Sequence, residues 1–234
     1  MALSNLDRAL DEAFTHEGPK GWRFGTDFND ASWFTLFPDI TETGNAAAPA
    51  ADDINVEELN GILLITTGTT DNDDLSFFTD AETIILQANK NYWFSCRVNS
   101  VVETTDIGYI FGLGNYDTPS DLLGTPPTEG VYFQTKGDGT DIDLVWNKAT
   151  TQIEQAGLGT VGADTFVKLG WKIEMSTAAG TGTVTAYVDD VIAYGPTEVS
   201  TLPLLSMGPM MYVEAEATGA KVVEVDFFFC GGDR

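Results

Sequence analysis

Residues 166–194, FVKLGWKIEMSTAAGTGTVTAYVDDVIAY, constrain the fold more than any other stretch of the chain. Large apolar residues occupy alternate positions of its first half: Val167, Leu169, Trp171, Ile173 and Met175. A period of two places these side chains on one face of a β-strand and the intervening polar residues on the other. The pattern resumes after a turn of small residues, and Asp189-Asp190 then predicts a tight hairpin, because Asp tolerates left-handed backbone. A sheet with one apolar face needs a second sheet to cover it, so the stretch predicts a sandwich.

Similar signals recur along the chain from residue 60 onward. Short strands are predicted near 61–67, 75–79, 82–87, 91–99, 107–113, 130–135, 141–147, 150–154, 166–176, 182–188, 191–194, 210–217 and 220–230. No helical pattern separates them. The chain is therefore predicted to be all-β, with residues 21–234 forming a two-sheet antiparallel β-sandwich or jelly roll. Residues 115–130 contain three prolines and no periodicity, which is typical of a contact loop.

The N-terminal residues differ from this pattern. Residues 4–15 predict a short helix, with Leu6, Leu10 and Phe14 on one stripe, and residues 1–20 are interpreted as an arm. A helix this short needs a surface to pack against, so the three apolar side chains are predicted to contact another subunit or a capsid. Residues 38–55 are small and polar, and they are predicted to form a flexible loop within the sandwich.

The charge of the chain excludes two classes of partner. Its 234 residues include 36 acidic and 11 basic ones, which gives a net charge of -25. Such a chain repels nucleic-acid phosphates and anionic lipid, so we expect neither nucleic acid nor membrane as a partner. It has no apolar run long enough to span a bilayer and no secretory signal, so we expect synthesis in a host cytoplasm. Cys96 and Cys230 are then expected to be buried free thiols, with a disulfide as the less favoured alternative.

Several motifs resemble the concanavalin A-like (laminin-G-like) jelly rolls. They are VEELNGILLITTG at 56–68, NYWFSCRV at 91–98, the hairpin from Gly182 to Asp190, and the last strand around Val223 to Phe227. The family includes lectins, glycan hydrolases and structural proteins of tailed-phage virions. The chain resembles the last group most, because it combines an acidic surface, an N-terminal arm and one sandwich. The resemblance implies a capsid decoration protein.

Hydrolases of this family place acidic residues at alternate positions of one strand, as E-x-D-x-E. Three pairs in this chain have that spacing: Glu214/Glu216, Asp141/Asp143 and Glu224/Asp226. Alternate positions share a face, and a retaining pair needs carboxyl groups about 5–5.5 Å apart. The third acid of the pattern is missing, because Thr218 and Val145 occupy its positions. We therefore predict no catalytic residue.

Calcium and a glycan are the remaining ligand hypotheses. Asp71, Asp73, Asp138 and Asp141 offer oxygen ligands of the kind Ca²⁺ prefers, but their spacing does not match a twelve-residue calcium loop. A turn explains them equally well, so no cofactor is predicted and calcium stays an alternative. Three aromatic side chains could stack on a sugar, although strand spacing also suits core packing: Tyr109, Tyr132 and Trp146.

These observations lead to one functional expectation and two alternatives. The protein is expected to be a non-enzymatic virion protein on the capsid exterior, bound to the major capsid protein. It is also expected to form a homo-oligomer, with a trimer favoured. The first alternative is a carbohydrate-binding module for attachment to host glycans, and the second is a glycan hydrolase.

Overall fold

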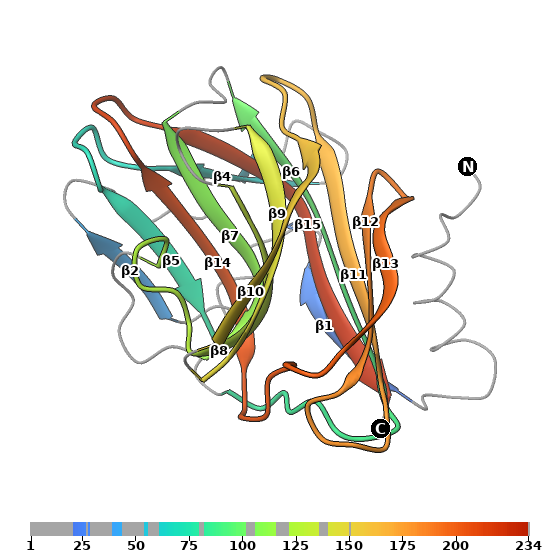
Figure 1. The fold of residues 1–234 in the computed structure, drawn as a ribbon. Coiled ribbons are helices and arrows are strands. Elements are labelled where there is room, and N and C mark those ends of the chain that lie inside the picture. Colours follow the sequence, from blue (N-terminus) through green and yellow to red (C-terminus); the bar gives the residue numbers. More distant parts are fainter. Residues whose placement is uncertain are drawn as a thin grey trace.

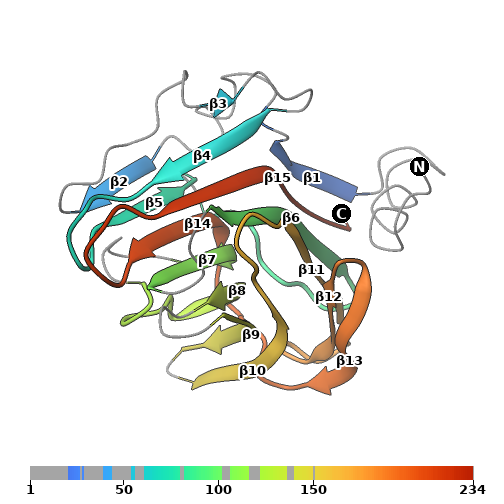
Figure 2. The same ribbon diagram turned by 90° about the horizontal axis from the view of Figure 1, so that it is seen from above.

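The structure is a computed structural model that describes residues 21–26, 28, 39–43, 54–55, 61–79, 82–101, 106–115, 122–135, 140–149 and 151–233. The regular elements of these residues are β-strands in two sheets that pack face to face (Figure 1; Figure 2). All pairs between named strands are antiparallel. The described residues include no helix long and apolar enough to cross a bilayer. The predicted two-sheet antiparallel sandwich is therefore confirmed.

Sheet A has eight strands in the order β13-β12-β11-β6-β15-β4-β3, with β1 also paired to β15. Their bounds are β1 Gly21–Thr26, β3 Ile54–Asn55, β4 Ile62–Thr66, β6 Asn91–Val101, β11 Val167–Met175, β12 Gly182–Val188, β13 Val191–Val199 and β15 Val222–Asp233. Sheet B has seven strands in the order β10-β9-β8-β7-β14-β5-β2. Their bounds are β2 Asp39–Thr43, β5 Asp74–Phe78, β7 Ile107–Gly114, β8 Glu129–Thr135, β9 Asp141–Lys148, β10 Thr151–Thr160 and β14 Gly208–Ala215.

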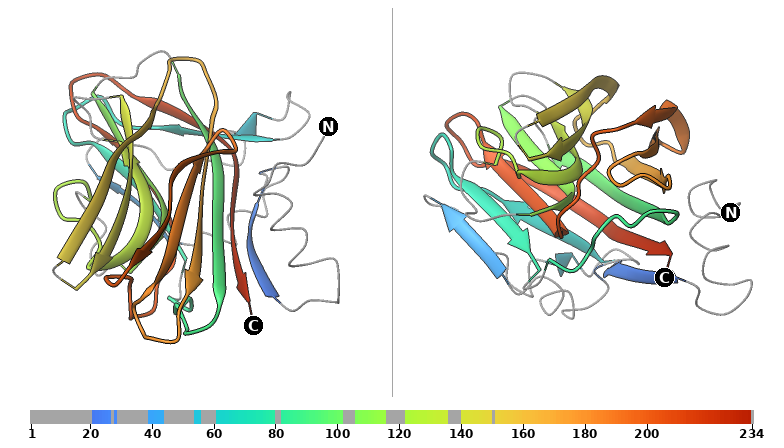
Figure 3. Two further views of the ribbon diagram at one scale, coloured as in Figure 1. Left: turned by 45° about the vertical axis from the view of Figure 1, so that its right-hand side comes forward. Right: turned by 60° about the horizontal axis from the view of Figure 1, so that its bottom comes forward.

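The chain crosses repeatedly between the sheets, which is typical of a jelly roll. Strands β4, β5 and β6 lie in sheets A, B and A in turn. The consecutive strands β14 and β15 likewise lie in different sheets, β14 in sheet B and β15 in sheet A. The edge strands β10 and β13 contact each other and bring the sheets together along one side (Figure 3). Strands β14 and β15 thus occupy interior positions of their sheets, although they come last in the chain.

Most predicted strands are present, but two predictions need correction. Residues 82–87 do not form a strand, because only Ile84 pairs with another segment, through a bridge to Met207. The predicted flexible loop at 38–55 contains strands β2 and β3. The loop prediction failed there because few large apolar residues mark these two edge strands. The N-terminal arm, with Leu6, Leu10 and Phe14, lies outside the described residues, so its helix and its contacts remain predictions.

The predicted hairpin at residues 189–190 is confirmed. Asp189 and Asp190 have φ angles of 48° and 66°, the left-handed conformations that a two-residue turn requires. The Asp189 carboxylate also accepts a hydrogen bond from the Lys168 backbone N–H at 2.9 Å. The Lys168 amine lies 3.1 Å from the Asp190 carboxylate. The turn therefore fixes the start of β11 as well as the β12–β13 register.

The main core lies between the sheets and is centred on aromatic side chains. Trp171 is fully buried, and its ring stacks on Phe94 with 5.7 Å between centroids. Phe94 in turn meets Phe228 edge-on at 5.1 Å. These three residues come from β11, β6 and β15, which are neighbours in sheet A. The alternating apolar face of residues 166–176 therefore faces the core as predicted.

The two cysteines face the same core as free, buried thiols, as predicted. Cys96 lies opposite Phe228, and Cys230 lies opposite Phe94, so the two thiols are diagonal neighbours on adjacent strands. Diagonal positions are about 7–8 Å apart, which exceeds the Cα separation that a disulfide spans. Burial raises the pKa of both thiols. Both are therefore apolar core residues and not reactive groups.

Candidate functional site

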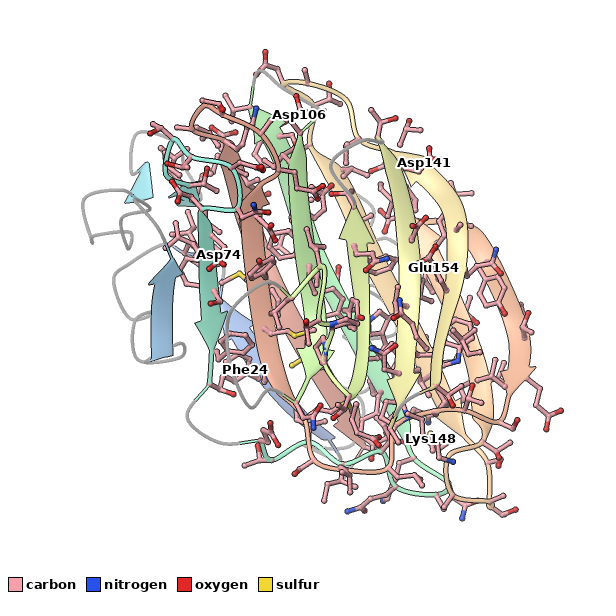
Figure 4. All side chains as sticks on the ribbon, turned by 60° about the vertical axis from the view of Figure 1, so that its left-hand side comes forward. Phe24, Asp74, Asp106, Asp141, Lys148 and Glu154 are labelled. Carbon is pink, nitrogen blue, oxygen red and sulfur yellow. The ribbon has the colours of Figure 1, made fainter. Side chains whose placement is uncertain are left out.

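The outer face of sheet B carries two of the three acidic pairs that the resemblance to glycan hydrolases singles out. Figure 4 looks onto this face. Glu214, on β14, lies directly opposite Asp74 of β5, and Asp143 lies on β9 of the same sheet. The pair Glu224 and Asp226 is different, because it belongs to β15 in sheet A. The structure therefore gathers two of the three candidate pairs on one sheet and separates the third.

The Glu214 carboxylate belongs to a buried cluster with Tyr212 and Asp74. Glu214 is 3% exposed, Asp74 is 2% exposed and Tyr212 is fully buried. The Tyr212 hydroxyl donates to Glu214 Oε2 at 2.5 Å and lies 3.4 Å from Asp74 Oδ2. Burial raises the pKa of Tyr212, and the hydrogen bond to Glu214 raises it further. The phenol therefore stays protonated and holds the carboxylate in place.

Residues 122–128, here called the roof segment, cover this cluster. Leu122 is buried in an apolar cluster on the outer face, and Leu123 packs against it. The other members of the cluster come from strands of sheet B: Phe78, Ile110, Tyr132, Val145, Met210 and Tyr212. Gly108, on β7, lets the tips of the Leu123 and Glu216 side chains lie directly against the strand, because a Cβ there would meet both of them.

Hydrogen bonds fasten the roof segment to the sheet. The Asn147 amide, on β9, donates to the Pro127 carbonyl at 2.6 Å and to the Tyr132 hydroxyl at 3.0 Å. At the end of the segment, the Glu129 backbone N–H donates to Asn115 Oδ1 at 2.7 Å. The roof segment is thus a fixed part of the fold that separates Glu214 and Tyr212 from solvent.

The second pair has a structural role at the edge of the sheet. Asp143 is 8% exposed and accepts a hydrogen bond from the Gly157 backbone N–H at 2.9 Å. Gly157 lies where the β9–β10 register shifts, and its φ angle is 68°. Asp143 therefore stabilises an irregular part of β10, while its predicted partner Asp141 is exposed at the start of β9.

The three aromatic residues predicted to stack on a sugar are buried, which corrects that prediction. Tyr109, Tyr132 and Trp146 are 1%, 0% and 2% exposed. Tyr109 and Trp146 face the core between the sheets, and Tyr132 lies under the roof segment. Burial raises the pKa of Tyr109 and Tyr132. None of the three presents a ring face on which a sugar could stack.

Three of the four aspartates considered as calcium ligands lie in the part of the chain that the structure describes. Asp73 is buried, and its Oδ2 accepts the Thr70 backbone N–H at 2.8 Å, as a turn requires. Asp71 and Asp141 are exposed, and Asp138 lies outside the described residues. Within the described residues, no three His, Cys, Asp or Glu side chains are arranged to hold a metal ion. Calcium therefore stays an untested alternative.

One buried carboxylate was missed by the sequence analysis. Glu129, at the start of β8, is 3% exposed. It accepts hydrogen bonds from the backbone N–H groups of Ala149 at 3.0 Å, Leu204 at 2.6 Å and Leu205 at 3.4 Å. These donors are distant in sequence, so no local pattern could have indicated the role of Glu129.

Comparison with known proteins identifies the fold but not a family. No family model and no curated protein sequence matches the chain. A Shewanella oneidensis protein of unknown function, SO2946, is similar in structure, with 14% identity and a TM-score of 0.59 over 100% of this chain and 95% of that one. An endo-1,3-β-glucanase from Streptomyces sioyaensis has 10% identity and a TM-score of 0.56 over 94% and 99%. Peanut lectin has 13% identity and a TM-score of 0.53 over 91% and 97%.

These similarities define the class of fold. Apart from the protein of unknown function, these neighbours are lectins and glycan-active enzymes with concanavalin A-like jelly rolls, as the sequence motifs implied. At such low identity they show the fold alone.

Proposed function

We propose that the protein is a non-enzymatic virion structural protein that decorates the outside of a tailed-phage capsid through protein–protein contacts. The observation that carries the proposal is the covering of the acidic face of sheet B. A hydrolase that used this face would leave its carboxylates open to a sugar, whereas Glu214 is 3% exposed beneath the roof segment. The burial of Glu214 therefore argues against glycan hydrolysis on this face, and it favours a role in which the protein binds a partner through another surface.

The charge of the chain supports the same role. With a net charge of -25, an acidic surface toward solvent keeps neighbouring copies on a crowded lattice from aggregating. Attachment would rely on apolar contacts, to which the predicted stripe of Leu6, Leu10 and Phe14 contributes. The partner in this proposal is the major capsid protein. Sedimentation of the chain together with purified capsid shells tests it.

The purified protein is expected to release no reducing sugar from a β-1,3- or β-1,4-glucan. The physical reason is that Tyr212 and Glu214 are hydrogen-bonded to each other under the roof segment, so neither meets a substrate. A reducing-sugar assay over several hours measures this, with a commercial glucanase as the positive control. Release that persists on repurification and disappears in Glu214→Gln would show instead that the protein is a hydrolase.

Glycan binding is the second candidate function. It is favoured by the similarity to peanut lectin and to the Emp47p carbohydrate recognition domain, which has 12% identity and a TM-score of 0.56 over 82% of this chain and 87% of that one. In this chain a sugar would have to bind at the exposed loops, since Tyr109, Tyr132 and Trp146 are buried. A glycan array separates the candidates, because saturable binding to one class of glycan favours the lectin-like role.

A further inference from the structure

The outer face of sheet A is covered at one point on β6. Tyr92 and Phe94 of this strand face the core between the sheets, so the alternate residues Trp93 and Ser95 point to the outside of the sandwich. Outward side chains of a two-sheet sandwich are normally open to solvent. Trp93 is nevertheless 5% exposed, and Ser95 is 1% exposed. A further segment of protein therefore lies over this part of β6.

The described residues beside Trp93 cannot provide this cover. Lys172 of β11 and Gly231 of β15 lie directly opposite Trp93 in the sheet. The Lys172 amine lies 2.9 Å from the Glu174 carboxylate on its own strand, so the lysine stem shields at most one side of the indole. Gly231 has no side chain to shield the other side. A large indole in this position would keep much of its surface exposed without a cover from elsewhere in the chain.

Two hydrogen-bonding groups support the same conclusion. Trp93 Nε1 and Ser95 Oγ are both buried, and neither has a hydrogen-bond partner among the described residues. Ser95 lies between Gly170 and Phe229, which offer it no polar side chain. Buried indole and hydroxyl groups are normally paired. The covering segment is therefore expected to bring hydrogen-bond acceptors as well as apolar surface.

Residues 1–20 end beside the covered point. Gly21, the first described residue, pairs with Asp233 at the end of β15, and β1 runs along β15 (Figure 2). The Asp233 carboxylate accepts hydrogen bonds of 2.8 Å from both the backbone and the side-chain N–H of Asn91, two residues before Trp93 on β6. The N-terminal segment therefore meets sheet A about two strand spacings, or roughly 10 Å, from the indole.

The other long stretches outside the described residues join the fold elsewhere. Residues 29–38 follow Phe28, which is buried in the core on the opposite face of sheet A. Residues 44–53 and 56–60 flank β3, which is separated from β6 by β15 and β4. Each remaining stretch has six residues or fewer. The position of its attached end therefore favours the N-terminal segment as the cover.

The helix predicted in this segment has a suitable length and surface. As a helix, residues 4–15 would extend about 18 Å, which is roughly the width of four strands, from β15 to β12. Residues 16–20 can span up to about 16 Å, enough to carry the helix from the start of β1 onto the face. The stripe of Leu6, Leu10 and Phe14 supplies apolar surface for the contact.

The charge of this face also suits the segment. Three basic side chains point outward here, each in an ion pair: Arg97, Lys168 and Lys172. The face is therefore less negative than expected for a chain with a net charge of -25. Residues 1–20 contain four acidic and two basic residues, so they meet less repulsion here than over the acidic outer face of sheet B.

We propose that residues 1–20 pack on the outer face of sheet A of their own chain, with the apolar stripe of the predicted helix over Trp93 and Ser95. The same copy is favoured over a second one, because a tether that ends beside the face gives the segment a high effective concentration there. The contact is peripheral, so it opens locally without unfolding the sandwich. The docking does not depend on the proposed capsid role. If capsid attachment uses the same stripe, the arm has to leave this face first.

Thiol labelling of the full chain tests the proposal without any capsid. Ser95→Cys places a thiol of nearly the same size under the arm, and the native Cys96 and Cys230 are buried and set the background rate. The introduced thiol is expected to react with DTNB at least about tenfold more slowly than the thiol of Val191→Cys, because a covered group reacts only when the cover opens. Val191 is a suitable reference, since it is 68% exposed.

Substitutions in the arm identify what provides the protection. Leu6→Asp/Leu10→Asp is expected to raise the labelling rate at position 95 by about tenfold or more, because carboxylates cannot pack on an apolar surface. The matched control, Arg8→Asp, makes the same change in net charge on the opposite side of the predicted helix and should leave the thiol protected. Circular dichroism shows whether each chain is folded. If Ser95→Cys does not fold, acrylamide quenching of Trp93, taken as the difference between each chain and its Trp93→Phe counterpart, gives the same comparison.

Three results would overturn the proposal. Labelling at position 95 as fast as in Val191→Cys, with the arm unchanged, would show that the face is open. Equal labelling rates in the two arm variants would show that the apolar stripe does not make the contact. Protection that is lost when the chain is diluted from about 100 to about 1 μM would show that the arm comes from a second copy.

Discussion

Replacing Trp171 with alanine is expected to lower the free energy of unfolding by about 3–5 kcal/mol. Trp171 is fully buried on β11 between β6 and β12, and its ring stacks on Phe94. Truncation removes this contact and leaves a cavity that neighbouring strands cannot fill, because both sheets hold their backbones at fixed spacing. Urea denaturation followed by tryptophan fluorescence and circular dichroism measures the change.

Two further variants make the Trp171 result interpretable. Trp171→Phe keeps an aromatic ring against Phe94 and is expected to cost less than the alanine variant. Val191→Ala, at a position that is 68% exposed, is expected to change stability by less than about 0.5 kcal/mol. If Trp171→Ala unfolds at the wild-type urea concentration, the side chain cannot lie in the core as described.

Raising the pH above about 9 is expected to destabilise the protein progressively. Burial raises the pKa of three tyrosines and both cysteines in the folded state: Tyr109, Tyr132, Tyr212, Cys96 and Cys230. In the unfolded chain these groups lose their protons near pH 10 for tyrosine and near pH 8.5 for cysteine. The stability they contribute is therefore complete below those values and is lost as the pH rises through and above them.

The expected alkaline effect is large because the groups act together. At pH 11 each buried tyrosine costs about 1.4 kcal/mol of stability and each buried thiol about 3.5 kcal/mol, since one unit of pKa difference corresponds to about 1.4 kcal/mol. The urea midpoint measured from pH 8 to pH 11 tests this. The slope should become shallower in Cys230→Ala than in the wild type. A midpoint that is constant over this range would contradict the burial of these groups.

The sequence alone predicts the strands whose alternation is strong. Residues 166–176 form β11 with its apolar face in the core, and Asp189-Asp190 makes the expected turn, because both features depend on local backbone preferences and a period of two. Residues 82–87 show that alternating apolar residues do not always form a strand. Ile84 and Leu86 alternate and are buried, yet the segment pairs only through Ile84 and Met207, so burial alone does not make a strand.

The candidate site was harder to predict, because a period of two tells which residues share a face and not whether that face is covered. Tyr132 and Glu214 were correctly assigned to alternating strands, and the roof segment then buries both. The cover comes from Leu122 and Leu123 in a proline-rich stretch without periodicity. Glu129 was missed for a related reason, since its hydrogen-bond donors lie 20 to 76 residues away in the chain.

Co-sedimentation with purified capsid shells that lack the protein tests the proposed role most directly. Full-length chain and a variant without residues 1–20 are each mixed with shells and separated on a density gradient. The full-length chain is expected to move with the shells at a fixed ratio to the major capsid protein. The truncated variant should bind more weakly while melting at nearly the same temperature. A full-length chain that stays at the top of the gradient would contradict capsid decoration.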